Sequence, residues 1–243
     1  MLEMAEVVPA ARVLDVAAGA GDQTLEIARR VGPNGYVLAT DLSPVILELA
    51  RGNARRAGYS TVEFKAIDGE KLDLPKASFD AAICRLGLMF FPAPIQGLRE
   101  MFHALKPGGR ACTMVFSTPE MNPCVAMMVS TAFKHAGLPP RDPYQLGGLL
   151  SLGKPGLIDE LFLEAGFSRV ATTKVAAPFG LPSVKDYLDF VRTSAGPILQ
   201  ILARLANDKR EAAWAEIEER LSAFSTPKGW EGPNELLLTA GQR

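Results

Sequence analysis

The stretch VLDVAAGAGDQT, residues 13–24, leads an apolar run into a loop of small residues and then into the amphipathic segment 25–30. This order predicts a strand, a tight turn and a helix. Gly19 and Gly21 can adopt a positive φ and leave room for a ligand, because they have no Cβ. The first helical turn then presents unpaired amide groups to a negatively charged ligand group. A Gly-x-Gly pair alone does not name that ligand, so its neighbours must.

Two neighbours argue against a dinucleotide, and a third indicates a ribose. Thr24 stands where the dinucleotide fingerprint has its third glycine. Asp15 lies inside the strand, where a dinucleotide site has apolar residues. Asp41 ends the next apolar run, 36–40, and lies 20 residues beyond Gly21. A carboxylate at that place can accept hydrogen bonds from both hydroxyls of an adenosine ribose.

The alternation of strand and helix continues along the chain. Ser43 and Pro44 provide an N-cap and a first helical residue for a helix expected over 45–58. The further elements expected are strands at 62–67, 79–84 and 110–116, a helix at 95–105 and a turn at 106–109.

The motifs in this part of the chain are LDVAAGAG (14–21), DLSP (41–44), DG (68–69), FDA (79–81) and LKPGG (105–109). In their order and spacing the chain resembles the class I S-adenosylmethionine-dependent methyltransferases. It resembles in particular the group that contains the ubiquinone/menaquinone-biosynthesis C-methyltransferases. The resemblance is close over residues 10–116 and looser beyond. It implies one α/β domain over residues 1–243, with a Rossmann-like, doubly wound, seven-stranded sheet that is mostly parallel and has an antiparallel last strand at 234–240.

The same resemblance implies S-adenosyl-L-methionine as the cofactor and S-adenosyl-L-homocysteine as its product. It assigns Asp15 to the loop and the methionine end of the cofactor, Asp41 to the ribose and Asp68 to the adenine amino group. The cofactor-binding residues expected in this way are Asp15, Ala17, Gly19, Gly21, Asp41, Leu42, Asp68, Gly69, Arg85 and Leu86. Leu42, Ile67 and Leu86 either sandwich the adenine ring or are plain core residues.

Two helical insertions are expected, at about 119–152 and 183–226, at the carboxyl ends of the strands, where open α/β folds bind ligands. The expected elements of this part are helices at 124–136 and 155–165, a strand at 168–176, and a helical region that starts after Ser183, breaks at Gly196-Pro197 and runs to about 224. The insertions carry methionine, aromatic and aliphatic residues, namely Met121, Met127, Met128, Phe133, Leu138, Tyr144, Leu149, Leu150, Tyr187, Phe190 and Val191. They predict a cap around an apolar substrate, or else simple packing of the insertions on the sheet.

Catalytic residues are harder to read, because a sulfonium methyl group is already electrophilic and needs mainly alignment with its nucleophile. A carbon or phenol nucleophile also needs a base, and His135, near the end of the first cap helix, is the candidate. Arg85 departs from the small or Asn residue frequent in the family and could reach an acidic group of the substrate. Asp142 and Tyr144 could contact the substrate, whereas His103 is expected on an outer face. No spacing of His and carboxylates predicts a metal site.

The overall composition limits the kinds of partner and the cellular location that can be expected for the protein. The formal net charge is -1 and there is no run of like charge, so a nucleic-acid partner is not expected. The Asn-Pro-Pro-Tyr sequence typical of nucleobase amine methylation does not follow the fourth strand. The three cysteines are expected to be reduced core residues. With no secretory signal and no apolar stretch of membrane-spanning length, the expectation is a soluble cytoplasmic protein.

The sequence leaves several points open. The oligomeric state is undetermined, with a homodimer as one option. The family usually carries a longer helical segment before the first strand, so either this protein lacks that lid or a segment precedes the residues given.

These observations predict transfer of a methyl group from S-adenosylmethionine to a small, largely apolar acceptor. Carbon or oxygen of an aromatic or quinone-like ring is the favoured target and nitrogen the second. The alternative is a protein that binds S-adenosylmethionine for non-methylating chemistry or as a sensor.

Overall fold

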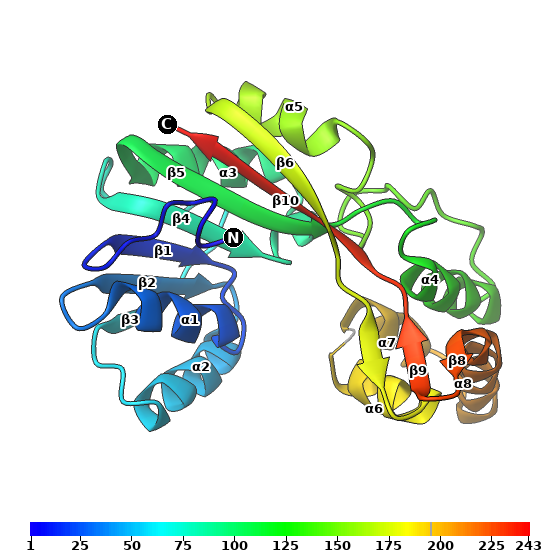
Figure 1. The fold of residues 1–243 in the computed structure, drawn as a ribbon. Coiled ribbons are helices and arrows are strands. Elements are labelled where there is room, and N and C mark those ends of the chain that lie inside the picture. The colour runs from blue at the N-terminus through cyan, green and yellow to red at the C-terminus, as the bar shows by residue number, and fades with distance from the viewer. Residues whose placement is uncertain (195) are drawn as a thin grey trace. The chain divides into compact units, whose positions relative to one another are not determined.

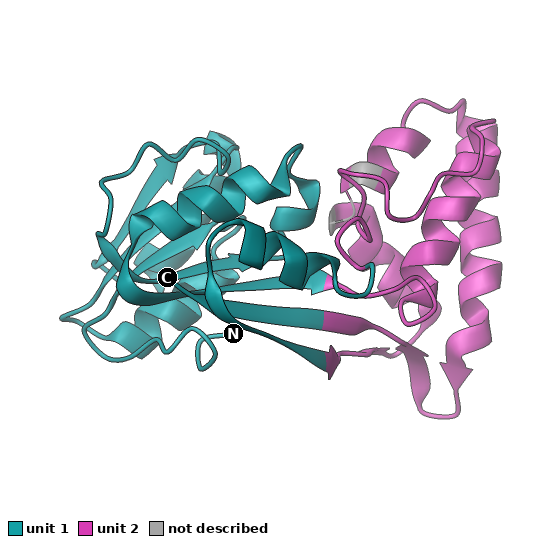
Figure 2. Cartoon of the chain, turned by 90° about the horizontal axis from the view of Figure 1, so that it is seen from above, with its two compact units in different colours: residues 1–115, 154–174, 237–243 teal, residues 116–153, 175–236 magenta. Residues whose placement is uncertain are grey.

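The computed structural model describes residues 1–194 and 196–243, apart from the side chains of residues 194 and 197. The chain divides into two units (Figure 2). Unit 1 comprises residues 1–115, 154–174 and 237–243, and unit 2 comprises residues 116–153 and 175–236.

A seven-stranded sheet, almost all of it in unit 1, has the strand order β3-β2-β1-β4-β5-β10-β6 (Figure 1). Its strands are β1 (Arg12–Val16), β2 (Tyr36–Asp41), β3 (Val62–Ala66), β4 (Phe79–Arg85), β5 (Leu105–Phe116), β6 (Ser168–Ala176) and β10 (Glu235–Gln242). The pairs β1–β2, β1–β4, β2–β3 and β4–β5 are parallel. In Figure 1 the arrow of β10 runs against its neighbours. The predicted mostly parallel sheet with one antiparallel strand is confirmed.

The helices of unit 1 lie where the sequence predicts them, with bounds that differ from the predicted ones by one to three residues. They are α1 (Asp22–Val31), α2 (Pro44–Arg56), α3 (Pro94–Ala104) and α5 (Leu157–Glu164), with a short 3₁₀ turn, η1 (Leu88–Phe90). Ser43 caps α2, because its side chain accepts a hydrogen bond from the amide of Ile46 at 3.4 Å. Gly166, with φ +102°, follows the end of α5 in the left-handed conformation that favours glycine.

The core of unit 1 follows from the alternation of side chains along the strands. Val13, Val37 and Ile83 are fully buried and belong to one cluster with Ile27 and Val31 of α1. Because successive residues of a strand point to opposite faces, the buried residues between these positions pack on the other face of the sheet. Both faces of the central strands β1, β2 and β4 are therefore buried, as expected for a doubly wound α/β fold.

The segment 106–109 was predicted as a turn ahead of the fifth strand, and this is wrong, because β5 begins at Leu105 and includes it. Leu105 pairs with Phe79 and Arg110 pairs with Ala81, so the register shifts and β5 carries the extra residues as an irregularity. Gly108 supports that bend with φ +83°. Glycines and a proline predict a turn, but here they let a paired strand bend without ending it.

Unit 2 has a core of its own. Its helices are α4 (Pro123–His135), α6 (Val184–Ser194), α7 (Gly196–Leu202) and α8 (Asn207–Leu221), followed by the 3₁₀ turn η2 (Ser222–Phe224). Helix α4 packs against α7 and α8, and Trp214 and Trp230 are buried among these elements. The predicted helix break near Gly196 corresponds to the end of α6 and the start of α7. Ala195 between them lies outside the described residues.

A small antiparallel sheet in unit 2 was not predicted. Its strands β7 (Phe179–Leu181), β8 (Ser225–Thr226) and β9 (Gly229–Gly232) lie in the order β7-β9-β8. Strands of two to four residues are too short to show an alternating pattern. Trp230 of β9 stacks on Tyr187 with ring centroids 4.4 Å apart, and its Nε1–H donates to the carbonyl of Leu221 at 2.7 Å. This tryptophan ties the small sheet to the helices of unit 2.

Two bulk predictions can be compared with the structure. Cys84, Cys112 and Cys124 are free and buried, as predicted. Within the described residues, no helix combines the length and the apolarity that crossing a membrane requires.

Candidate functional site

The predicted site residues of unit 1 follow the ends of four parallel strands. Since β1, β2, β3 and β4 run in the same direction, their carboxyl ends lie at one edge of the sheet (Figure 1). The residues at this edge are Asp15, Ala17, Gly19 and Gly21 after or within β1, Asp41 and Leu42 at β2, Asp68 and Gly69 after β3, and Arg85 and Leu86 at β4. The fold therefore brings the ten predicted cofactor residues to one edge of one unit.

Asp15 is a buried carboxyl group inside β1, only 1% exposed. Its Oδ2 accepts a hydrogen bond from Thr24 Oγ1 at 2.6 Å, and its Oδ1 has no partner among the described residues. Burial raises the pKa of Asp15 to about 7, while the Thr24 hydroxyl and the nearby Arg85 charge oppose that rise. Thr24 thus orients the Asp15 carboxyl group. In the sequence, Thr24 was noted only as a position where the third glycine of a dinucleotide site is missing. The available signal was a hydroxyl in the first turn of the helix that follows the glycine loop.

Asp41 is held by two backbone amides from different segments. Its Oδ2 accepts from the amide of Gly19 at 3.0 Å, and its Oδ1 accepts from the amide of Ser43 at 2.9 Å. Each carboxylate oxygen has capacity for a further hydrogen bond. The glycine loop and Asp41 are therefore in direct contact, and the carboxylate is fixed in orientation.

The glycine loop adopts left-handed backbone conformations at three of its positions. Ala17 and Gly19 both have φ +56°, and Gly21 has φ +90°. A Cβ at Gly19 would have no neighbour within 4 Å, whereas a Cβ at Gly21 would lie 3.0 Å from Ala50 Cβ. Gly21 therefore allows α2 to approach the loop, and Gly19 leaves open space beside the Asp41 carboxylate.

The loop after β4 touches the loop after β1. A Cβ on Gly87 would lie 2.5 Å from Ala17 Cβ, closer than any side chain tolerates, so this position requires glycine. The preceding Leu86 has φ +55°, an uncommon conformation for a residue with a side chain. Sequence reasoning named Leu86 but missed Gly87. A lone glycine directly after a buried strand was the only signal for it.

Arg85 ends β4 with an exposed side chain that forms no hydrogen bond or ion pair with the described residues. It lies close enough to Asp15 for its charge to lower the pKa of that carboxyl group. A free guanidinium is thus available at the edge where the other predicted residues gather.

Leu42, Asp68 and Gly69 differ in their surroundings. Leu42 is 74% exposed, which excludes the alternative that it is a plain core residue. Asp68 is exposed and its Oδ1 accepts from the amide of Glu70 at 2.9 Å. Gly69 packs against the ring of Phe91, which leaves no space for a Cβ. An exposed leucine beside Asp41 is available to cover a flat ring.

His135 belongs to unit 2, at the end of α4. Its Nε2 lies 2.9 Å from Glu216 Oε2, and Lys134 Nζ lies 2.8 Å from the same oxygen. These two partners lower the pKa of Glu216. His135 lines an open groove along α8 together with Glu216, and it is not among the residues that line the apolar cavity of unit 2.

The remaining candidate residues lie in different parts of the fold. His103 is exposed in α3, as predicted. Asp142 lines the apolar cavity of unit 2, whereas Tyr144 does not. Across residues 1–194 and 196–243, no cluster of three or more His, Cys, Asp or Glu side chains could hold a metal ion.

The first 136 residues match the model of the ubiE/COQ5 methyltransferase family. Among curated proteins, the chain is similar to the ubiquinone/menaquinone biosynthesis C-methyltransferase UbiE of Ectopseudomonas mendocina (strain ymp). The two are 37% identical over 131 residues, which are 54% of this chain and 51% of that protein. The chain thus spans about half the length of the curated relatives it matches.

Solved structures share the fold. The YcgJ protein of Bacillus subtilis superposes with a TM-score of 0.67 at 20% identity, covering 100% of this chain and 96% of that one. The [4+2]-cyclase SpnF superposes with a TM-score of 0.61 at 22% identity, covering 99% and 77%. At such low identity these likenesses establish the architecture and leave the reaction to the site.

Proposed function

The chain belongs to the ubiE/COQ5 methyltransferase family, and from this premise we propose that it transfers a methyl group from S-adenosylmethionine to a small, largely apolar acceptor. The observation that carries the proposal is the Asp41 carboxylate. It is fixed by the amides of Gly19 and Ser43 beside a left-handed glycine loop. A carboxylate so oriented suits the paired hydroxyls of a ribose.

The residues of this edge fit the proposed cofactor. A buried Asp15 Oδ1 without a partner suits a cationic ligand group, since an unpaired buried polar atom is costly. The backbone at Gly19 leaves space for close approach. In this proposal Asp15 holds the methionine end, Asp41 the ribose and Asp68 the adenine amino group.

S-adenosylmethionine supplies, when bound, a methyl group made electrophilic by its sulfonium sulfur. The protein's own contribution is binding and orientation. Asp15 is proposed to hold the methionine end and Asp41 the ribose, and Gly87 lets the loop after β4 close against the loop after β1. Alignment of this kind lowers the barrier of a transfer reaction by several kcal/mol, about 7–11 at best.

The proposed acceptor is an aromatic or quinone-like ring methylated at carbon or oxygen, with nitrogen as the second choice. The curated relative of Ectopseudomonas mendocina is named as a C-methyltransferase of ubiquinone and menaquinone biosynthesis. The near-neutral charge of the chain also favours a small acceptor over a polyanion.

Two side chains are proposed for catalysis. Arg85 offers an unpaired guanidinium at the end of β4, suited to an acidic oxygen of the acceptor. His135 is oriented by the Glu216 carboxylate, an arrangement that suits a general base. We expect Arg85→Met and His135→Asn each to lower kcat at least tenfold, and His135→Asn to leave S-adenosylhomocysteine affinity within threefold. An unchanged kcat for either variant removes that residue from the reaction.

A transfer assay tests the proposal. The purified chain is incubated with S-adenosylmethionine and separate quinols, phenols and amines, and methylated product and S-adenosylhomocysteine are quantified by mass spectrometry. We expect equal amounts of both products with a quinol or phenol, and none with Asp41→Ala. The matched control is Asp189→Ala, which changes an exposed aspartate of unit 2.

Binding of S-adenosylmethionine without methylation of any compound would contradict methyl transfer. It would favour the alternative, a protein that binds the same ligand for other chemistry or for sensing. The fold accommodates more than one reaction, since the structural neighbour SpnF is a cyclase.

A further inference from the structure

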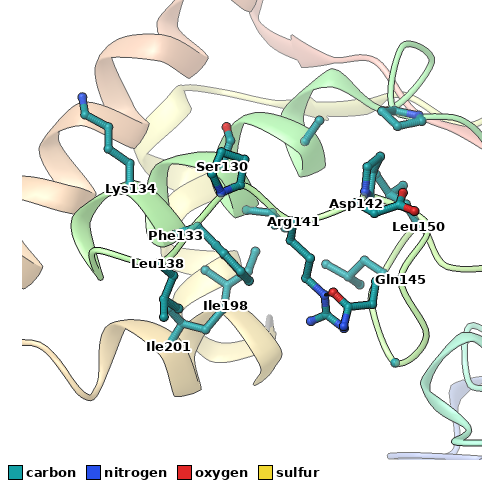
Figure 3. A pocket seen from close by; sticks show the side chains of 18 residues that line it. Ser130, Phe133, Lys134, Leu138, Arg141, Asp142, Gln145, Leu150, Ile198 and Ile201 are labelled. Carbon is teal, nitrogen blue, oxygen red and sulfur yellow. Dashed lines mark hydrogen bonds between the residues drawn. The ribbon is translucent and has the colours of Figure 1, made fainter.

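Unit 2 contains an apolar cavity whose lining includes none of the residues proposed for cofactor binding or catalysis. Its volume is about 530 Å³, within the range of small-molecule sites. The walls come from α4, α7 and the irregular segment 137–153 (Figure 3). The apolar side chains that line it are Val129, Phe133, Leu138, Leu149, Leu150, Ile198 and Ile201.

The cations of this cavity differ in their pairing. Lys134 is neutralised by Glu216, with Nζ 2.8 Å from a carboxylate oxygen. Arg141 uses Nε to bond Gln145 and Nη2 to donate to the carbonyl of Leu146 at 2.8 Å. Its Nη1 has no acceptor among the described residues, and it forms no ion pair with any of them. A charged donor therefore remains available at the cavity.

The acidic residue of the lining does not cancel this charge by contact. Asp142 accepts a hydrogen bond from the amide of Tyr144 at 2.9 Å and is in no ion pair. In Figure 3 the guanidinium of Arg141 extends toward Gln145. The cavity thus combines aliphatic and aromatic walls with one oriented guanidinium donor.

We propose that this cavity binds an amphipathic organic acid, with its apolar chain among Phe133 and the neighbouring aliphatic side chains and its anionic oxygen on Arg141 Nη1. Burial of the chain supplies most of the binding free energy. The charge-assisted hydrogen bond sets the orientation and selects an acid over a neutral molecule. This site lies wholly within unit 2 and does not depend on methyl transfer.

Calorimetry with decanoate below its micelle concentration, and with 1-decanol as the neutral analogue, tests the proposal on the intact chain. We expect one molecule of decanoate to bind per chain and 1-decanol to bind about tenfold more weakly, which is the effect of one charge-assisted hydrogen bond near solvent. Arg141→Met should lower decanoate affinity to that of 1-decanol. Arg204→Met, which removes an exposed charge outside the cavity, should leave the tenfold preference intact.

A second pair of variants tests the cavity itself. Ala126 lines it, so Ala126→Phe should fill part of the space and weaken both probes at least tenfold. Ala203→Phe places the same ring on an exposed position outside the cavity and should change neither affinity. The near-ultraviolet circular dichroism of Trp214 and Trp230 verifies that each variant keeps the fold of unit 2.

Several results would overturn the proposal: no binding of decanoate, binding of many molecules per chain, equal affinity for both probes, or an unchanged affinity in a folded Ala126→Phe variant. A separate titration with S-adenosylhomocysteine keeps the two proposals distinguishable. If the chain bound no S-adenosylhomocysteine, the proposed function would be refuted, and the decanoate result would remain valid.

Discussion

In unit 1 the candidate site is built from backbone, whereas in unit 2 the cavity is built from side chains. Asp41 takes both of its protein hydrogen bonds from main-chain amides, and the loop beside it depends on left-handed glycines. The cavity of unit 2 depends on which apolar side chains face it and on the single donor of Arg141. Backbone sites leave short fixed motifs in a sequence, and side-chain cavities do not.

The first test of this contrast is the separate stability of the two units. Trp230→Ala removes a large buried ring that stacks on Tyr187, so we expect the free energy of unfolding of unit 2 to fall by about 3–5 kcal/mol. Denaturant titration followed by Trp214 fluorescence measures this. S-adenosylhomocysteine affinity, a property of unit 1, should change less than twofold.

The control for that experiment is Leu146→Ala, which shortens an exposed side chain of unit 2 and should cost less than about 0.5 kcal/mol. If Trp230→Ala abolished cofactor binding in a chain whose unit 1 stays folded, the division into separate sites would be wrong.

The stability of unit 1 should depend on pH, because unit 1 contains the buried carboxyl group of Asp15. The folded pKa of Asp15 is about 7, against 3.8 for an unburied aspartate, so its contribution to stability is complete below about pH 4 and is lost as the pH rises through 7. We therefore expect Asp15→Asn to be more stable than the parent at pH 8 by up to about 4 kcal/mol, and this gain to shrink toward pH 5. Thermal unfolding at several pH values checks it.

Asp189→Asn, at an exposed position, should show no such trend. The Asp15→Asn variant should also bind S-adenosylmethionine more weakly, because it lacks the carboxylate for the cationic end. A stability difference that is the same at pH 5 and pH 8 would rule out the titration of Asp15.

The variant that tests the ribose assignment, Asp41→Ala, should have the next largest effect, a loss of cofactor affinity. Asp41→Ala removes an oriented carboxylate that we expect to accept two hydroxyls, so S-adenosylhomocysteine should bind at least about a hundredfold more weakly. Calorimetry measures this, with Asp189→Ala as the matched control. An affinity within threefold of the parent would refute the assignment.

The contact between two loops of unit 1 gives the smallest effect. Gly87→Ala would place a methyl group against Ala17, so we expect a loss of about 1–3 kcal/mol in stability and a severalfold loss in cofactor affinity. Gly52→Ala is the control, because its Cβ would meet only the flexible end of Arg56 and helix propensity favours alanine. An unchanged Gly87→Ala variant would show that the two loops need no close approach.

Much of unit 1 could be predicted from the sequence, because β1, β2 and β4 are mostly buried apolar runs and the loop after each of them carries a motif residue. The exceptions are informative. Thr24 and Gly87 act through one contact each, with Asp15 and with Ala17, and no pattern within the sequence reveals such partners. The segment 106–109 was misread because local turn propensity was overridden by pairing within the sheet.

Unit 2 was less predictable for the same physical reason. Its strands β7, β8 and β9 are too short to show a period, and their stability comes from Trp230 packing on residues distant in sequence. Some apolar residues of the two insertions belong to the core of unit 2, and others line its cavity. Tyr187 is buried in the core, whereas Phe133 and Leu138 line the cavity. Only tertiary structure separates these two uses of an apolar side chain.

A structure of this chain crystallised with S-adenosylhomocysteine tests the central claim most directly. We expect both ribose hydroxyls within hydrogen-bond distance of the Asp41 carboxylate, the amino-acid end beside Asp15 and the adenine against Leu42. A nucleoside bound elsewhere, with the Asp41 carboxylate contacting only the amides of Gly19 and Ser43, would contradict it.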